Sequence, residues 1–370
     1  WISPMDCLRA TWMSGKTRPK EFRVTQLEAL CHFLEERQAD IQHALCEDLH
    51  KPCFETEFTE ILLVRNELAN ALNNLSCWMK DEKVNKNLMT QLDCAFIQKD
   101  PYGVVLIIGA FNFPIQLTLL PLVGAIAAGN CVILKPSEVS SCTERLLAEA
   151  LPCYLDSVSS SIASFALLKN QNEAEGFLIW SVRVGKIIMT AAAKHVTPLT
   201  LELGGKSPCY VDKCCNFQNA ANRIVWGKFL NAGQTCIAPD YVICTPIMQE
   251  EVLAPILPIF TVNDMEEAIH FINCRDRPLA VYAFSCDNKV VNEVLDRTSS
   301  GGFCGNDTLL HVSLITLPFG GIGCSGFGKY HGKFTFDTFT HFRGCLLRIR
   351  SDTNLVPRKQ TQNRSNSKTF

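Results

Sequence analysis

The sequence predicts an α/β fold built around a parallel sheet, and three observations lead to that prediction. Val104–Ile108 is a continuous apolar run of strand length, bounded by Gly103 and Gly109. Cys131–Leu134 is a second such run, and the helix-like segment Leu117–Ala128 lies between the two. Apolar residues at every position indicate strands that are covered on both faces, and a strand, a helix and a second strand form the unit from which parallel sheets are built.

Helices are expected before this unit and directly after it. From Glu21 to Asp81 the apolar residues recur at helical spacing with charges between them, which predicts two or three amphipathic helices. The alternation in 87–99 is too weak to assign a strand there. A further helix is expected at Thr143–Leu155. The serine-rich stretch 153–176 should hold a strand, a helix and another strand, but it shows no clear pattern.

The second half of the chain repeats the alternation of strands and helices. The expected strands are 240–244, 256–260 and 281–285, and the expected helices are 217–230, 265–273 with Asp264 as its N-cap, and 289–295. The polar and basic tail from Ser351 onward is expected to be disordered.

The composition favours a globular protein with free thiols. The 370 residues are 47% hydrophobic and 19% charged, which suffices for two or three packed units. The formal net charge of −2 argues against nucleic-acid binding. The 19 cysteines include neither a C-x-x-C pair nor a Cys/His ligand spacing, which argues against a metal site and favours a reducing compartment. Because no signal stretch opens the sequence, we expect a cytoplasmic protein.

One segment approaches the length of a membrane span. Ile115–Leu134 comes near the roughly 20 apolar residues that a spanning helix needs. Gln116, Pro121, Gly129 and Asn130 interrupt it. We therefore interpret it as a buried helix followed by a buried strand, and we expect no integral membrane span.

Three side chains are candidates for chemistry, each with a plainer alternative. Lys135 ends a predicted strand, where open α/β sheets bind ligands, although it would also suit a solvated loop. Glu202 lies between two leucines, and burial would raise its pKa toward the range of a general base, whereas an outward-pointing edge glutamate needs no function. Cys236 follows a Gly-Gln-Thr turn, but free cysteine is mostly a small core residue.

Five motifs in a fixed order connect these residues. They are N-F-P at 112–114, K-P-S-E at 135–138, L-E-L-G-G-K at 201–206, G-Q-T-C at 233–236 and P-F-G-G-I-G-C-S-G-F-G at 318–328. Together they resemble the NAD(P)-dependent aldehyde dehydrogenase superfamily, and the resemblance extends from about Met13 to Arg348. The segments 195–206 and 330–341 resemble its class 3 branch, most of all the members that oxidise medium- and long-chain aldehydes.

The resemblance implies an incomplete aldehyde dehydrogenase fold, with a Rossmann-like nucleotide-binding domain plus an α/β catalytic domain with a small strand extension. The implied limits are 1–203 for the N-terminal helices and the NAD(P)-binding domain, 204–328 for the catalytic domain, shortened after 245, 329–350 for the strand extension used in oligomerisation, and 351–370 for the disordered tail. The resemblance further implies a homodimer, a small-molecule aldehyde substrate from lipid metabolism, and no metal.

The resemblance also assigns roles to residues. Cys236 would be the nucleophile that forms a thiohemiacetal and then a thioester. Glu202 would be the base for the hydrolytic water, and the Asn112 amide would stabilise the oxyanion together with the backbone N–H of Cys236. The cofactor would be NAD or NADP. Its implied contacts are Lys135 and Glu138 near the adenine ribose, Ser181 before V-G-K, and Glu251 at the nicotinamide ribose.

Two departures from the family pattern bear on function. Only fifteen positions separate Cys236 from Glu251, where the family has several tens of residues more. An internal segment is therefore missing, and we expect apolar surface that relatives bury to be exposed. Trp180 stands where the family has a glycine beside the dinucleotide, directly after the degraded stretch 153–176.

Two other functions remain open from the sequence. The missing segment and Trp180 would suit a non-catalytic remnant that acts as a dimer partner or binding protein. A cofactor-independent thiol esterase would need only Cys236 and Glu202 for acyl transfer.

Overall fold

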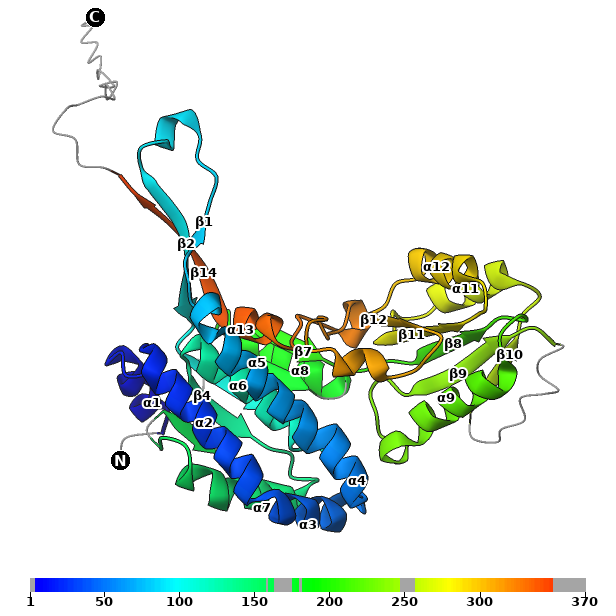
Figure 1. The fold of residues 1–370 in the computed structure, drawn as a ribbon, viewed down its shortest axis with the longest axis horizontal. Helices are drawn as coiled ribbons and strands as arrows, with labels where there is room; N and C mark the ends of the chain where they lie inside the picture. The colour runs from blue at the N-terminus through cyan, green and yellow to red at the C-terminus, as the bar shows by residue number, and fades with distance from the viewer. Residues whose placement is uncertain (1–3, 158, 163–174, 180–181, 247–256, 349–370) are drawn as a thin grey trace, which may run out of the picture. The chain divides into compact units, whose positions relative to one another are not determined.

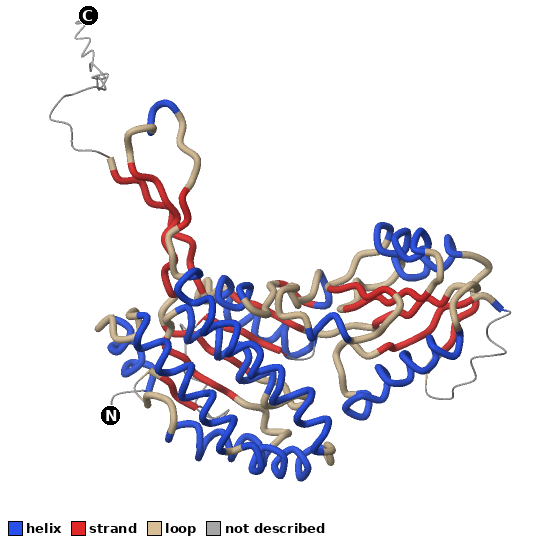
Figure 2. The backbone as a smooth tube through the Cα atoms, in the orientation of Figure 1, coloured by secondary structure: helices blue, strands red, loops and turns tan. Residues whose placement is uncertain are grey.

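The computed structural model describes residues 4–157, 159–162, 175–179, 182–246 and 257–348. Contacts divide the chain into two compact units, one of residues 1–79 with 100–341 and the other of residues 80–99 with 342–370. Helices and sheets both contribute to the fold, as Figure 1 and Figure 2 show. Within the described ranges, no helix is long and apolar enough to cross a membrane.

The first large sheet has six strands in the order β13-β7-β6-β3-β4-β5. β3 (Val104–Ile108) and β4 (Cys131–Lys135) pair in parallel. α6 (Gln116–Ala128) connects them and is buried at every position, so neither of its faces carries a polar stripe. The predicted strand, helix and strand are confirmed within one residue at each end, because continuous apolar runs of this kind are stable only when covered on all sides.

The remaining strands of this sheet come from later parts of the chain. Three of them pair in parallel: β5 (Ser160–Ile162) with β4, β6 (Glu175–Ile179) with β3, and β7 (Leu199–Glu202) with β6. The fourth, β13 (Gly326–Phe327), pairs antiparallel with β7. Strands therefore do occur in the stretch that had no readable pattern. The helix expected between β5 and β6 falls at 163–174, outside the described residues.

The helices around this sheet are more numerous than predicted. The first 80 positions hold α1 (Pro4–Met13), α2 (Lys20–Glu36), α3 (Gln38–Leu49), α4 (Cys53–Thr56), a π-helix (Glu57–Ile61) and α5 (Leu62–Trp78). α2 and α5 pack on α6. After β4, α7 (Ser141–Ala150) ends earlier than the predicted Leu155, because Pro152 lacks a backbone N–H and the chain tightens into a 3₁₀ turn.

A buried ion pair holds the start of α6, and a glycine ends the helix. At its start, Glu60 accepts hydrogen bonds from the backbone N–H groups of Ile115 (3.1 Å) and Gln116 (2.8 Å). Lys51 donates to the other oxygen of Glu60 at 2.8 Å, and both side chains are inaccessible to solvent. At the end of α6, Gly129 takes the left-handed conformation (φ 92°) that favours glycine after a helix.

The second large sheet has five parallel strands in the order β10-β9-β8-β11-β12. They are β8 (Ser207–Val211), β9 (Pro239–Cys244), β10 (Ile259–Thr261), β11 (Ala280–Phe284) and β12 (Gly302–Gly305). The strand expected at 256–260 instead begins at Ile259, after Pro258, whose ring nitrogen cannot donate to a sheet.

Helices accompany this sheet largely where they were expected. They are α9 (Phe217–Phe229), α11 (Met265–Asn273) and α12 (Asn288–Arg297). α8 (Val182–Ala193) instead contacts β7 of the six-stranded sheet. The predicted N-cap of α11 is confirmed, because the Asp264 carboxylate accepts from the Glu267 N–H at 2.9 Å. A short helix, α13 (Lys333–Thr338), follows the glycine-dense loop.

The second unit is built on a three-stranded sheet in the order β1-β2-β14. β1 (Glu82–Lys83) pairs antiparallel with β2 (Cys94–Pro101), and β14 (Thr340–Leu347) completes the sheet. The region 87–99, left unassigned from sequence, thus contains most of β2. Contacts place both large sheets in one unit and so mark no boundary at 203 or 328. The predicted domain limits there stay a prediction.

We expect Glu60→Gln to lower the free energy of unfolding by about 3 to 5 kcal/mol, because it leaves the buried Lys51 ammonium without a counter-charge. Urea unfolding of the full chain measures this loss. The matched control is Glu57→Gln, whose pair with Arg65 is partly exposed, and it should cost less than about 1 kcal/mol. Equal losses in the two variants would contradict a special role for the buried pair.

Candidate active site

A strained turn presents Cys236 just before β9. α9 ends at Phe229, and Asn231 and Ala232 then adopt φ values of 56° and 54°. This left-handed conformation costs roughly 1 to 2 kcal/mol for a residue with a side chain. Glu55 offsets part of that cost by accepting from the Asn231 N–H at 3.0 Å. The turn is therefore maintained by its surroundings, and the position of Cys236 follows from it.

Glu202 ends β7 with its carboxylate inside the protein, and the residue is only 2% exposed. The Cys236 thiol donates to its Oε1 at 3.2 Å, and the Tyr330 hydroxyl donates to its Oε2 at 2.7 Å. Gly326 pairs opposite Glu202, where a Cβ would lie 2.1 Å from a backbone oxygen, so no larger residue fits. Glu202 is thus not the outward-pointing edge residue that the sequence left open.

Burial determines the protonation of this pair. Burial raises the pKa of Glu202 to about 6, against the opposing effect of the hydrogen bonds from Tyr330 and Cys236. The pKa of the Cys236 thiol lies well above its usual value because of burial and, next, the negative charge of Glu202. At neutral pH the thiol therefore keeps its proton while Glu202 is largely ionised. The carboxylate is placed to receive the thiol proton.

Asn112 contacts the same turn as Cys236. Its side-chain amide donates to the backbone carbonyl of Gln234 at 2.9 Å. In turn, the side-chain amide of Asn231 donates to the backbone carbonyl of Asn112 at 2.6 Å. An amide nitrogen carries two N–H donors, so the bond to Gln234 leaves one for another acceptor. The structure thus brings Asn112 to the loop of Cys236, and its role toward an oxyanion stays a prediction.

Lys135 and Glu138 lie together at the carboxyl end of β4. Lys135 is buried, and its ammonium donates to the Pro136 carbonyl at 3.0 Å and to the Glu138 carboxylate. Burial alone would raise the pKa of Glu138, but the bond from Lys135 lowers it below its usual value. Glu138 itself remains exposed. Lys135 is therefore a buried, paired residue rather than the solvated loop lysine that the sequence left open.

The other predicted cofactor contacts cannot be placed in this site. Ser181 and Glu251 lie outside the described residues, and so does Trp180. Over the part of the chain that the structure describes, no group of three or more His, Cys, Asp or Glu side chains is arranged to hold a metal ion.

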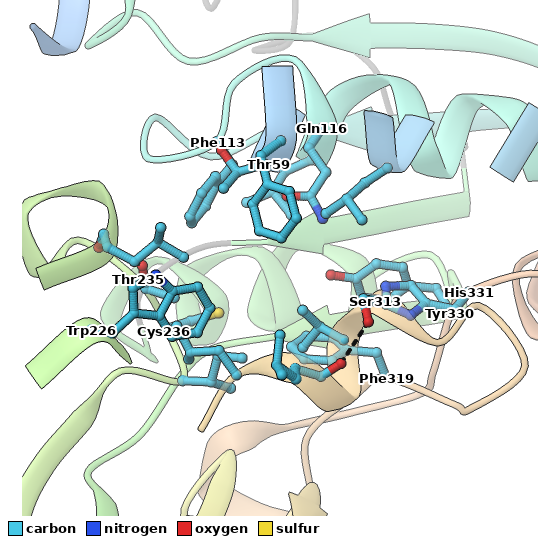
Figure 3. Close-up of a pocket in the computed structure, with 18 residues that line it drawn as sticks. Thr59, Phe113, Gln116, Trp226, Thr235, Cys236, Ser313, Phe319, Tyr330 and His331 are labelled. Atoms are coloured by element: carbon cyan, nitrogen blue, oxygen red, sulfur yellow. Dashed lines mark hydrogen bonds between the residues drawn. The ribbon is translucent and has the colours of Figure 1, made fainter. Parts of the chain in front are cut away.

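An apolar cleft of about 670 Å³, including its part open to solvent, lies against Cys236. Figure 3 shows Phe113, Thr59 and Gln116 across the cleft from Trp226 and Cys236. The full lining is Phe58, Thr59, Leu63, Phe113, Gln116, Leu117, Trp226, Leu230, Thr235, Cys236, Ile237, Leu309, Leu310, Val312, Ser313, Phe319, Tyr330 and His331. Neither an acidic nor a basic side chain other than histidine is among these residues, and burial lowers the pKa of His331 to about 4, so the cleft wall is uncharged at neutral pH.

Sequence reasoning missed Tyr330 as a site residue. The only signal was its place at the start of the segment 330–341, which supported the resemblance without assigning a role to any residue in it. Its contact with Glu202 joins positions 128 apart, so nothing local in the sequence could reveal it.

Comparison with known proteins finds one family over most of the chain. The model of the aldehyde dehydrogenase family matches residues 11–246 and 243–344. Aldehyde dehydrogenase family 3 member B1 of Rattus norvegicus and of Homo sapiens are each 46% identical, over 92% of this chain and 90% of the relative. Aldehyde dehydrogenase family 3 member A2 of Pongo abelii is 42% identical over 92% of this chain and 87% of its own.

Solved structures agree with this similarity. The substrate-bound state of Staphylococcus aureus AldH is 32% identical, covers 95% of this chain and 94% of its own, and has a TM-score of 0.91. Succinic semialdehyde dehydrogenase from Streptococcus pyogenes, solved with NADP⁺, matches with a TM-score of 0.83 over 94% of each chain. Its identity of 17% makes this a likeness of fold alone.

The same alignments show the missing segment. The match to the rat relative extends over 426 positions, more than the 370 residues of this whole chain, so several tens of its positions have no counterpart here. The two pieces of the family match meet at 243–246, at the end of β9. This break lies between Cys236 and Glu251, where the sequence predicts the internal deletion.

Proposed function

The chain belongs to the aldehyde dehydrogenase family, and on that premise we propose that it oxidises aldehydes to carboxylic acids with NAD or NADP. The observation that carries the proposal is the hydrogen bond between the Cys236 thiol and the buried Glu202 carboxylate. A protonated thiol beside an ionised carboxylate can become a nucleophile at the moment of attack.

Glu202 serves both halves of the proposed reaction. It takes the Cys236 proton and passes it to solvent before the second half, while the sulfur attacks the aldehyde carbonyl to give a thiohemiacetal. The NAD or NADP that Lys135 and Glu138 would hold would supply the acceptor for the hydride that leaves this carbon. The resulting thioester is hydrolysed by a water whose proton passes to Glu202, which releases the acid and frees the thiol. The Asn112 amide stabilises the negative oxygen of the intermediate.

Lys135 and Glu138 would hold the adenine ribose of the cofactor. The exposed Glu138 carboxylate can accept hydrogen bonds from ribose hydroxyls, and the buried Lys135 ammonium keeps it ionised and oriented. Both stand at the carboxyl end of a parallel strand, where this type of sheet binds its ligands. We propose further contacts from Ser181 and Glu251 on the family resemblance.

We expect Glu202→Gln to reduce kcat by about 10² to 10⁴-fold, because the reaction loses its general base. In the wild-type protein kcat should rise with pH through about 6, the pKa of Glu202, since the ionised carboxylate is the active form. Formation of the reduced cofactor with a medium-chain aldehyde measures both effects.

Cys236→Ala and Glu57→Gln are the controls for this assay. Cys236→Ala should abolish the signal, whereas Glu57→Gln should leave it unchanged. Equal rates for wild-type protein and Cys236→Ala would overturn the proposed oxidation, and ester hydrolysis that needs Cys236 but no cofactor would support the esterase instead.

Medium- and long-chain aldehydes are the proposed substrates. The cleft wall at Cys236 is made mainly of aliphatic and aromatic side chains, including Phe58, Leu63 and Trp226. Such a surface gains affinity from each methylene that it removes from water. The apolar cleft wall therefore supports a role in the oxidation of lipid-derived aldehydes.

A homologous series of straight-chain aldehydes tests the chain-length preference. We expect kcat/KM to rise about fourfold per added methylene until the cleft is filled, which corresponds to about 0.8 kcal/mol each. A rate constant that is flat or that falls with chain length would contradict the proposal.

We also propose that the protein is a cytoplasmic homodimer. Its thiols are all free, as a reducing compartment requires. In the second unit, β14 carries exposed apolar side chains at Phe342, Leu346 and Leu347, which suit contact with a second copy. Light scattering of protein purified from the cytoplasmic fraction should give twice the mass of the chain, and a monomer at micromolar concentration would contradict this proposal.

A further inference from the structure

The Glu202 carboxylate has a donor at each oxygen, and only one of the two belongs to the proposed chemistry. Cys236 occupies Oε1, while the Tyr330 hydroxyl holds Oε2 at the shorter distance of 2.7 Å. Tyr330 is 2% exposed and passes no proton in the proposed reaction. A buried phenol that binds a buried base needs an explanation in terms of what it does to that base.

The Tyr330 ring cannot easily leave its position. Its backbone is paired with Phe319 through two hydrogen bonds of 2.9 and 2.8 Å, and its ring packs edge-on against the Phe319 ring at 5.3 Å. Glu67, which lies in α5, fixes the turn that follows Tyr330. Its carboxylate accepts from the Gly332 N–H at 2.9 Å and from the Thr335 hydroxyl at 3.0 Å. The hydroxyl is therefore presented to Glu202 at a fixed point.

The Tyr330 phenol acts on Glu202 as a donor. Burial raises the pKa of the Tyr330 hydroxyl well above its usual value, so this group keeps its proton across the working range of pH. A donor stabilises the ionised form of a carboxylate, and so the bond keeps Glu202 available as a base at lower pH than burial alone would allow.

We propose that Tyr330 is a positioning residue for the general base: by holding Oε2 of Glu202, it directs Oε1 at Cys236. This inference rests on the proposed oxidation, in which Glu202 takes protons from the thiol and from water. Tyr330 acts through Glu202 and has no step of its own.

Few titratable groups other than Tyr330 can change the pKa of Glu202. Cys236, from the loop before β9, and Tyr330, from the segment after β13, are the described groups that bond to Glu202. Beyond Tyr330 stand Glu67, which is committed to Gly332 and Thr335, and His331, whose pKa burial lowers to about 4. Neither bonds to the Glu202 carboxylate in the described part of the chain, so we expect a changed titration of Glu202 to report on the Tyr330 hydroxyl.

Tyr330→Phe tests the proposal, because it removes the hydroxyl and leaves the ring packing. Infrared difference spectra over a pH series detect the protonated carboxyl of Glu202, assigned by its loss in Glu202→Gln. We expect the midpoint to move from about 6 to at least about one pH unit higher in Tyr330→Phe. The acid limb of kcat should move by the same amount, with KM little changed.

Tyr282→Phe is the matched control, since it also removes a buried phenol, one that donates to the Ile237 carbonyl at 2.6 Å and makes no bond to Glu202. It should leave the Glu202 midpoint in place. An unmoved or lowered midpoint in Tyr330→Phe would overturn the inference. If the midpoint moves but wild-type protein forms no reduced cofactor, the oxidation fails while the effect of Tyr330 on Glu202 stands, so the two failures are distinguishable.

Discussion

The bonds to the buried Glu202 carboxylate connect three parts of the chain that are far apart in sequence. Glu202 ends a strand of the six-stranded sheet, Cys236 precedes a strand of the five-stranded sheet, and Tyr330 follows the glycine-dense loop. A carboxylate without donors would be costly to bury in its charged form, so the thiol and the phenol both stabilise Glu202 as a carboxylate. The requirement of one buried charge thus organises the site.

Two other buried carboxylates also hold segments that are distant in sequence. Glu60, in a π-helix, holds the start of α6 beside Phe113, and Glu67, in α5, holds the turn after Tyr330. Both come from the helices before the first sheet, yet they position cleft residues from elsewhere in the chain. The N-terminal helices, which the sequence predicted to be amphipathic, therefore also support the walls of the cleft at Cys236. π-helical turns often occur near functional sites, and this one lies beside the cleft at Cys236.

The two strands on either side of the shortened connection are neighbours in the second sheet. β9 and β10 pair in parallel, with Ile259 opposite Val242, on either side of the shortened connection. Phe260, in the strand after that connection, is 39% exposed and contacts the rings of Tyr241 and Phe271. The deletion lies next to the strand that follows Cys236, while the bonds of Cys236 and Glu202 are formed by residues that remain.

The sequence by itself determined the strands and helices whose cause is local, such as Val104–Ile108 and α6, because an unbroken apolar run has few ways to be covered. It also singled out Glu202 and Cys236 through their motifs. The tertiary structure alone decided that Tyr330 binds Glu202 and that Lys51 neutralises Glu60. These contacts depend on which buried charge meets which donor after the chain has folded, and no spacing along the sequence records that choice.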